Sequence, residues 1–200
     1  GSGAVGAVYD ATDEKTGANV AVKVLRAGAR ADRARIERLR RDAPAESAVA
    51  HPGIAPVIAF HAEGAGEETP AFLVIERLRG ASLATLVERS GPIAPDRAAR
   101  IASQVLEALG AAHRAGLVHG AVKPTNVFLV TAAAGDDVRV LDFGAAEEPS
   151  RQGSDGETDP RTDLAGVGAC IVHALTGAPP ATATRAALAT ARPDLPAGFA

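Results

Sequence analysis

Hydrophobic residues occur in short runs over the first third of the chain. Two of these runs flank a turn at Lys15–Gly17. A more charged segment, 31–41, has a thin apolar face at helical spacing and is predicted to form a helix. The strand candidates are 7–9, 20–25, 55–60 and 71–75. This part of the chain is therefore predicted to be rich in strands.

Beyond residue 80 the apolar residues mostly recur at helical spacing. Ser82 is placed to cap a short helix over 82–89, and Gly116 is the stop signal for a long one over 95–115. A further apolar helix is predicted over 163–175, after a polar loop at 147–161. The pattern also predicts a small hairpin formed by 127–130 and 138–141. Strands followed by helices indicate two lobes, 1–78 and 79–200.

Composition narrows the class of protein. The chain has 200 residues, 46% hydrophobic and 22% charged, which is typical of one globular domain. The net charge of -3 gives no reason to expect attraction to nucleic acid or a membrane, and the single Cys170 excludes an internal disulfide. No signal peptide or long apolar run is visible, so we expect a cytoplasmic location. The chain opens on Gly1 and contains no methionine. We therefore expect a fragment, and the full-length protein could carry a membrane anchor.

The first motif is rich in glycine. Gly1, Gly3, Gly6 and Val8 match the pattern G-x-G-x-x-G-x-V. Glycines let the backbone approach phosphates and offer its N–H groups to them. The dinucleotide-binding form of this pattern needs a following helix, whereas the residues after Gly6 are predicted to form a strand. A plain turn is the alternative in a chain so rich in glycine and alanine.

Two further motifs place charged residues beside hydrophobic strands. Val20–Lys23 matches the V-A-I-K strand, in which the lysine needs an anionic partner because its neighbours are apolar. Val140–Gly144 reads V-L-D-F-G, with Asp142 as a candidate ligand for a metal that bridges phosphates. The alternatives are a lysine on an edge strand and a surface turn.

The octapeptide His119–Asn126 is the most informative motif. It reads H-G-A-V-K-P-T-N, a catalytic-loop pattern in which an Asp is expected at the third position to accept a proton. That position is Ala121, whose methyl group cannot accept one. We do not expect His119 to be a metal ligand or a triad member, because nucleophiles and metal-ligand spacing are missing around it.

In this order and at these spacings, the motifs resemble the bacterial Ser/Thr protein kinases over nearly the whole chain. His51–Ile54, Phe72–Glu76 and Asp163–Gly168 agree with the same family. The resemblance implies an α+β, bilobal protein-kinase-like fold that is truncated at both ends. The implied N-lobe is small and β-rich, and the implied C-lobe is helical. The resemblance also implies ATP and Mg²⁺ as cofactors.

The same resemblance implies roles for individual residues. Lys123 would neutralise the transferring phosphoryl group, while Asn126 and Asp142 would hold Mg²⁺. Phe143 would take part in regulation as the Phe of D-F-G. The implied ATP-binding residues are Gly1, Gly3, Gly6, Val8, Ala21, Lys23, Ile75, Glu76, Leu78 and Phe128.

The chain also departs from the family pattern. A missing base at Ala121 would lower turnover by roughly 10²–10⁴-fold. Gly120 replaces the Arg that usually binds the phosphorylated activation loop. Asp42 aligns with the regulatory Glu but is one methylene shorter, which puts its pairing with Lys23 in doubt. Glu46 is a substitute partner, and two solvated helix charges are the alternative. The activation segment is short and lacks an A-P-E motif.

Four functions remain open from the sequence. The leading hypothesis is a pseudokinase that binds Mg-ATP, with Ser/Thr phosphotransfer impaired or absent, and that acts on a protein substrate or a regulated partner. A weak but active kinase would use Asp142 or a substrate group as the base. A nucleotide-independent interaction scaffold is the third hypothesis. A small-molecule phosphotransferase is the fourth, because His119-Gly120 resembles the H-G-D loop of antibiotic kinases; the Gly-rich loop and Lys123-Pro124 disfavour it.

Overall fold

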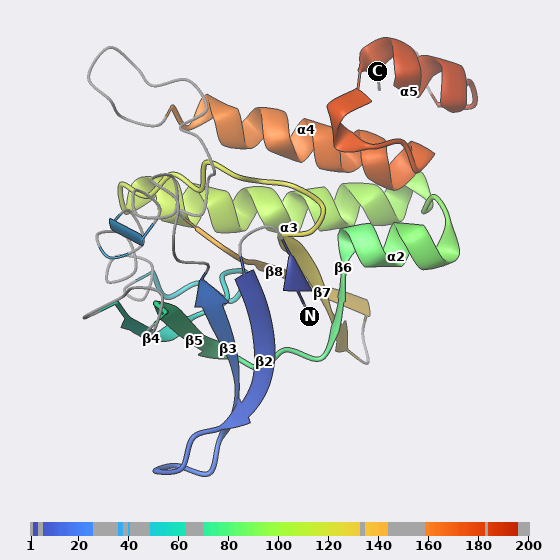
Figure 1. The fold of residues 1–200 in the computed structure, drawn as a ribbon. Coiled ribbons are helices and arrows are strands. Elements are labelled where there is room, and N and C mark those ends of the chain that lie inside the picture. Colours follow the sequence, from blue (N-terminus) through green and yellow to red (C-terminus); the bar gives the residue numbers. More distant parts are fainter. Residues whose placement is uncertain are drawn as a thin grey trace.

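The computed structural model describes residues 2–3, 6–25, 36–37, 40, 49–62, 70–132, 135–143, 159–182 and 184–195. One five-stranded sheet, one three-stranded sheet and a group of helices make up these residues. In Figure 1, α4 lies along one side of α3, and the smaller sheet lies on the other side.

The five-stranded sheet is antiparallel and has the order β1-β2-β3-β5-β4. Its strands are β1 (Ser2–Gly3), β2 (Gly6–Thr12), β3 (Asn19–Leu25), β4 (Val57–His61) and β5 (Phe72–Glu76). Leu25, Val57 and Leu73 pack with the helical Ile36 on one face of the sheet. All four strand predictions are confirmed. β2 runs further than 7–9, because it pairs with β3 along its whole length.

The remaining elements form the helical part of the molecule. They are β6 (Gly80–Ser82), α2 (Leu83–Ser90), α3 (Pro95–Arg114), β7 (Val127–Ala132), β8 (Gly135–Val140), α4 (Arg161–Thr176), the 3₁₀ helix η1 (Pro180–Thr182) and α5 (Arg185–Ala191). Strands β7 and β8 form the predicted hairpin, and β6 joins it at the edge. Ser82 caps α2 as predicted, because its side chain accepts a hydrogen bond from the N–H of Thr85.

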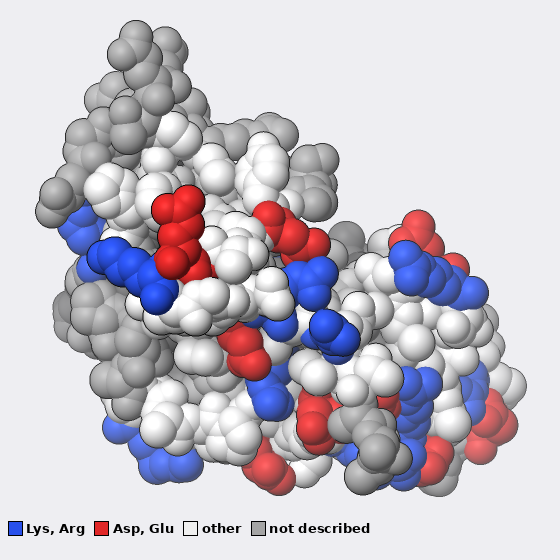
Figure 2. Space-filling view, turned by 90° about the horizontal axis from the view of Figure 1, so that it is seen from below, with Lys and Arg blue, Asp and Glu red and all other residues white. Residues whose placement is uncertain are grey.

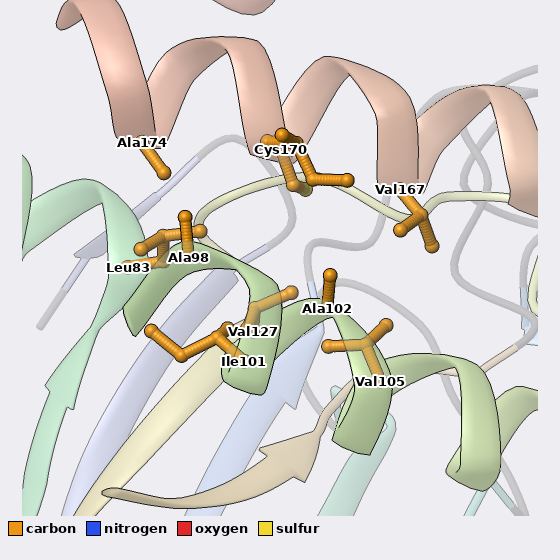
Figure 3. Close-up of a pocket in the computed structure, with 10 residues that line it drawn as sticks. Leu83, Ala98, Ile101, Ala102, Val105, Val127, Val167, Cys170 and Ala174 are labelled. Carbon is orange, nitrogen blue, oxygen red and sulfur yellow. The ribbon is translucent and has the colours of Figure 1, made fainter. Parts of the chain in front are cut away.

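The helices enclose a closely packed core. Val167, Cys170 and Ala174 of α4 point toward Ile101 and other residues of α3 (Figure 3). The space between them is about 10 Å³, room for roughly one water, and its lining is almost wholly apolar. Burial raises the pKa of the Cys170 thiol to about 12, so this thiol stays protonated and unreactive. This cavity is a packing gap rather than a ligand site.

Some details differ from the sequence predictions. The loop predicted to reach residue 161 ends earlier, because α4 already begins at Arg161. The short β6 exists through its pairing with β7, which no local pattern predicts. The helix α5 and the 3₁₀ turn before it were not predicted either. The two sheets are joined between Glu76 and Gly80. The lobe boundary at residue 78 falls in this connection and stays a prediction.

Candidate functional site

A cleft of about 440 Å³ is lined by both sheets and by α2. Its lining residues are Val8, Asp10, Ala21, Lys23, Ile75, Glu76, Arg77, Leu78, Gly80, Ala81, Ser82, Thr85, Arg89, Thr125, Phe128, Leu141 and Asp142. The cleft therefore gathers eight residues that the sequence assigned to nucleotide or metal binding. Figure 2 shows the molecule from below Figure 1, with charges of both signs interspersed on that face.

Lys23 lies in the middle of the five-stranded sheet. Its strand pairs with β2 on one side and with β5 on the other, opposite Val8 and Leu73. The residue is only 7% exposed, and its Nζ lies 2.6 Å from Oδ2 of Asp142. A lysine this buried is stable only beside an anion, so the sequence correctly required a partner. Asp142 as that partner was not predicted.

Asp142 is the second residue after β8 and has a left-handed backbone conformation, with a φ of 67°. Asp tolerates this region better than most residues, because its short side chain can hydrogen-bond locally. The next residue, Phe143, is 1% exposed and contacts the His119 ring with centroids 4.6 Å apart. Burial of Phe143 thus anchors the turn that holds the Asp142 carboxylate in the cleft.

His119 ties the octapeptide to this turn. Its Nε2–H donates to the carbonyl of Leu141 at 2.8 Å, and its Nδ1 accepts from the N–H of Ala121 at 3.1 Å. The ring is 1% exposed, and burial lowers its pKa. A neutral ring with one donor and one acceptor satisfies both bonds. His119 therefore holds the backbone in place through both of its ring nitrogens.

Asp163 on α4 fixes the same loop from the other side. Its carboxylate is fully buried and accepts the N–H groups of His119 at 2.9 Å and Gly120 at 2.8 Å. Nε2 of His113, on α3, lies 2.7 Å from the same carboxylate. From the sequence, Asp163 was interpreted only as part of a segment that agrees with the family pattern. The available signal was an acidic residue at the start of an apolar helix, which must find partners when buried.

Ala121 is held in this loop by its backbone alone. Its carbonyl accepts a hydrogen bond from Nδ2 of Asn126 at 3.0 Å, while its N–H donates to His119. Asn126 is buried, and its own N–H donates to the carbonyl of Lys123 at 2.8 Å. The Lys123 residue is exposed and does not line the cleft. The loop is thus fully formed around a position that carries only a methyl group.

The residues predicted to hold magnesium suit that ion. Nδ2 of Asn126 donates to the carbonyl of Ala121, while Oδ1 accepts a long bond of 3.4 Å from the Thr125 hydroxyl and keeps a second lone pair that a metal could use. Asp142 has one oxygen on Lys23 and a second oxygen to offer. Magnesium is usually held by one or two protein oxygens together with substrate phosphates. Across the described residues, no larger cluster of His, Cys, Asp and Glu forms a metal site.

The glycine motif is part of a hairpin. Gly3 pairs with Gly6, whose φ is 154°. A Cβ on Gly6 would lie 1.9 Å from the carbonyl oxygen of Val24, so only glycine fits there. Gly3 and Gly6 do not line the cleft. Gly1, Asp42 and Glu46 lie outside the described residues, and so does the predicted pairing of Lys23 with the regulatory segment.

One charged pair that the sequence did not predict lies at the cleft. The guanidinium of Arg77 makes two bonds to the carboxylate of Asp10, at 2.8 and 3.1 Å. This pairing lowers the pKa of Asp10 and raises that of Arg77. The pair connects β2 to the segment between the two sheets.

A small antiparallel sheet, a helical part and a cleft between them with a buried Lys–Asp pair define the class of bilobal kinase-fold proteins. Residues 1–190 match the family model described as protein kinase domain. The chain therefore belongs to the protein kinase family.

Curated relatives are bacterial Ser/Thr kinases. Serine/threonine-protein kinase PknB of Mycolicibacterium smegmatis is 33% identical over 205 residues, covering 90% of this chain and 32% of that protein. Serine/threonine-protein kinase pkn2 of Myxococcus xanthus is 38% identical over 146 residues, covering 73% of this chain and 17% of that protein. The chain thus spans a third or less of the length of these two relatives.

Solved structures agree with the fold. A crystal structure of a mutant PknI kinase domain from Mycobacterium tuberculosis is 25% identical, with a TM-score of 0.81. The match covers 98% of this chain and 79% of that one. A structure of Rad53 in complex with AMP-PNP has a TM-score of 0.71 at 23% identity, covering 99% and 53% of the two chains, and shows the fold alone. Within the described residues, no helix is both long and apolar enough to cross a membrane.

Proposed function

We propose that this chain binds ATP with Mg²⁺ in the cleft and transfers the γ-phosphoryl group poorly or not at all. The observation that carries the proposal is the composition of the cleft. Apolar residues from both sheets, the connecting segment and the Lys23–Asp142 pair line one volume of about 440 Å³. This volume lies within the range of small-molecule and cofactor sites.

Residues of both sheets would contact the adenine ring, and Lys23 would contact the phosphates. Val8 and Ala21 of the five-stranded sheet face the same cleft as Phe128 of β7, which suits a flat adenine ring between them. Ile75, Glu76 and Leu78 lie beside this position and offer backbone groups to the base. At the other end, Lys23 supplies the positive charge for phosphates.

The proposed metal ion would be held by Asp142 and Asn126. When bound, it would neutralise charge on the phosphates. Lys23 would then have to share its ammonium between Asp142 and the nucleotide. AMP-PNP in the Rad53 structure, a protein of the same fold, is in line with a nucleotide in this cleft.

Impaired transfer follows from the loop. The backbone of residue 121 is fixed by His119 and Asn126, but Ala121 offers no group to accept a substrate proton. Asp142 is a poor substitute as a base, because one of its oxygens is bound to Lys23 at 2.6 Å. A general base contributes roughly 10²–10⁴-fold, so turnover should fall by about that factor.

Thermal unfolding in the presence of ATP tests the proposal. Saturation at about 100 times the Kd stabilises a protein by about 2.7 kcal/mol, and a domain of this size gains roughly 2–4 °C per kcal/mol. We expect a rise in melting temperature of about 5 °C or more with millimolar Mg-ATP, and a smaller rise without the metal. Replacing Lys23 by Met should abolish most of it, while Lys15→Met, in the exposed β2–β3 turn, should not. No shift at millimolar ATP would contradict nucleotide binding and favour the scaffold function.

A further inference from the structure

The N-cap residue of α2 and two polar residues of the helix face the cleft in a single stripe. Ser82, Thr85 and Arg89 all line it and are spaced three and four residues apart, so they share one helix face. Helical side chains lean toward the N-terminus of their helix, so the Arg89 side chain leans back toward Thr85. We call these three residues the α2 stripe.

Arg89 is the cation of the cleft without a partner in the described part of the chain. Lys23 is bound to Asp142, and Arg77 is bound twice to Asp10. No ion pair or hydrogen bond is formed by the exposed Arg89 guanidinium within the described residues. The guanidinium fork matches phosphate geometry, so an anion is the natural ligand for it.

The hydroxyls of the α2 stripe add a donor. Ser82 Oγ accepts the N–H of Thr85 and donates its own proton to Thr85 Oγ1 at 3.0 Å. The Thr85 hydroxyl is then an acceptor within the pair, and its hydrogen is left to donate. A donor beside an arginine favours a ligand oxygen that carries negative charge.

The stripe begins only a few residues after the segment assigned to the base. Ser82 follows Leu78 closely in the chain and lines the same cleft, so we place its hydroxyl beside the sugar of a nucleotide whose base contacts Ile75–Leu78. Arg89 comes about two helical turns further along α2, roughly 10 Å from Ser82 before its side chain leans back. The stripe thus extends along α2 from Ser82 to the exposed Arg89.

We infer that the α2 stripe is a subsite for a phosphate attached to the ribose, so that the cleft prefers nucleotides phosphorylated on the 2′- or 3′-hydroxyl. The inference rests on the proposed nucleotide site. An acidic side chain of a protein substrate is a different ligand for Arg89. The ribose phosphate is favoured because all three residues line the nucleotide cleft itself.

Binding of three adenosine nucleotides tests the inference. The Kd values of AMP, adenosine 2′,5′-bisphosphate and adenosine 3′,5′-bisphosphate are measured by calorimetry on the whole chain. One new charge-assisted contact corresponds to about tenfold in Kd, so at least one bisphosphate should bind about tenfold more tightly than AMP. Arg89→Gln should remove this preference, so that the ratio of the AMP Kd to the bisphosphate Kd falls to about one. Arg79→Gln should retain it, because Arg79 is also exposed but does not line the cleft.

The other outcomes overturn the inference in distinguishable ways. Equal affinity for AMP and both bisphosphates, with ATP still bound, would contradict the ribose-phosphate subsite but not the proposed nucleotide site. Equal loss of AMP and bisphosphate affinity in Arg89→Gln means that Arg89 serves the site as a whole. A preference that survives in Arg89→Gln but falls when an acidic peptide is added assigns the arginine to a polypeptide. If neither ATP nor any of these nucleotides binds, the inference and the proposed function both fail.

Discussion

The two walls of the cleft keep different parts of the family's chemistry. On the wall formed by the five-stranded sheet, the reactive side chain is retained: Lys23 is buried and bound to Asp142. In the loop 119–126, which reaches the opposite wall only through Thr125, the supporting contacts are present through His119 and Asp163, while residue 121 carries only a methyl group.

This difference teaches that the loop does not need its reactive side chain in order to fold. The bonds at residue 121 run through its backbone N–H and carbonyl, which any residue other than proline supplies. The bonds from Asp163 also reach backbone N–H groups. Under the proposed function, Ala121 therefore removes proton acceptance without removing the geometry around it.

The largest expected effect comes from breaking the support of the loop. Asp163→Ala would leave two buried N–H groups and His113 without their shared acceptor. We expect the free energy of unfolding to fall by roughly 3–5 kcal/mol, as when one partner of a buried polar network is removed. Urea denaturation measures it. Asp137→Ala, at an exposed position of β8, is the matched control and should change stability by less than about 0.5 kcal/mol. Similar losses in both variants would show that the Asp163 contacts do not support the fold.

A smaller effect follows from the neutral His119 ring. Burial lowers its pKa in the fold, so between the folded and unfolded pKa values the unfolded chain binds the extra proton. Stability is therefore fully present above the unfolded value of about 6.5 and decreases as the pH falls below it, by at most about 1.4 kcal/mol per pH unit.

Denaturation series between pH 7 and pH 5 check this dependence. His119→Gln should be less stable at neutral pH but should show a shallower decline on acidification. His61→Gln, which changes an exposed histidine of β4, should keep the decline of the parent protein. An unchanged slope in His119→Gln would mean that this ring does not resist protonation.

The sequence predicted the fold better than it predicted the contacts. Strand runs, the helical spacing over 82–89, 95–115 and 163–175, and the Ser82 cap are local signals that correspond to elements of the structure. The helix predicted over 31–41 lies mostly outside the described residues. The short β6 depends on pairing with a strand almost fifty residues away and leaves no local pattern. The same holds for the missed polar contacts. The Lys23–Asp142 pair joins β3 to the segment after β8, and spacing along the chain does not reveal which ions meet.

The site residues divide in the same way. The sequence assigned Val8, Ala21, Ile75 and Phe128 to one place through their family positions, and all four line the cleft. Arg89 and Thr85 belong to no motif. Their place in the cleft lining follows only from the orientation of α2 in the structure. The roles of all six residues in nucleotide binding remain predictions, which the titrations with ATP and the bisphosphates test.

Restoring the base tests the central claim most directly. Ala121→Asp should raise the turnover of γ-³²P-labelled ATP, followed as autophosphorylation and released phosphate, by roughly 10²–10⁴-fold. The Kd of Mg-ATP should stay within about threefold of the parent value, because Ala121 is not part of the cleft lining. That result would show an intact frame and nucleotide site that lack only a proton acceptor. Equal turnover by the two proteins, or a parent protein already as fast as an ordinary kinase at about 1–100 s⁻¹, would contradict it.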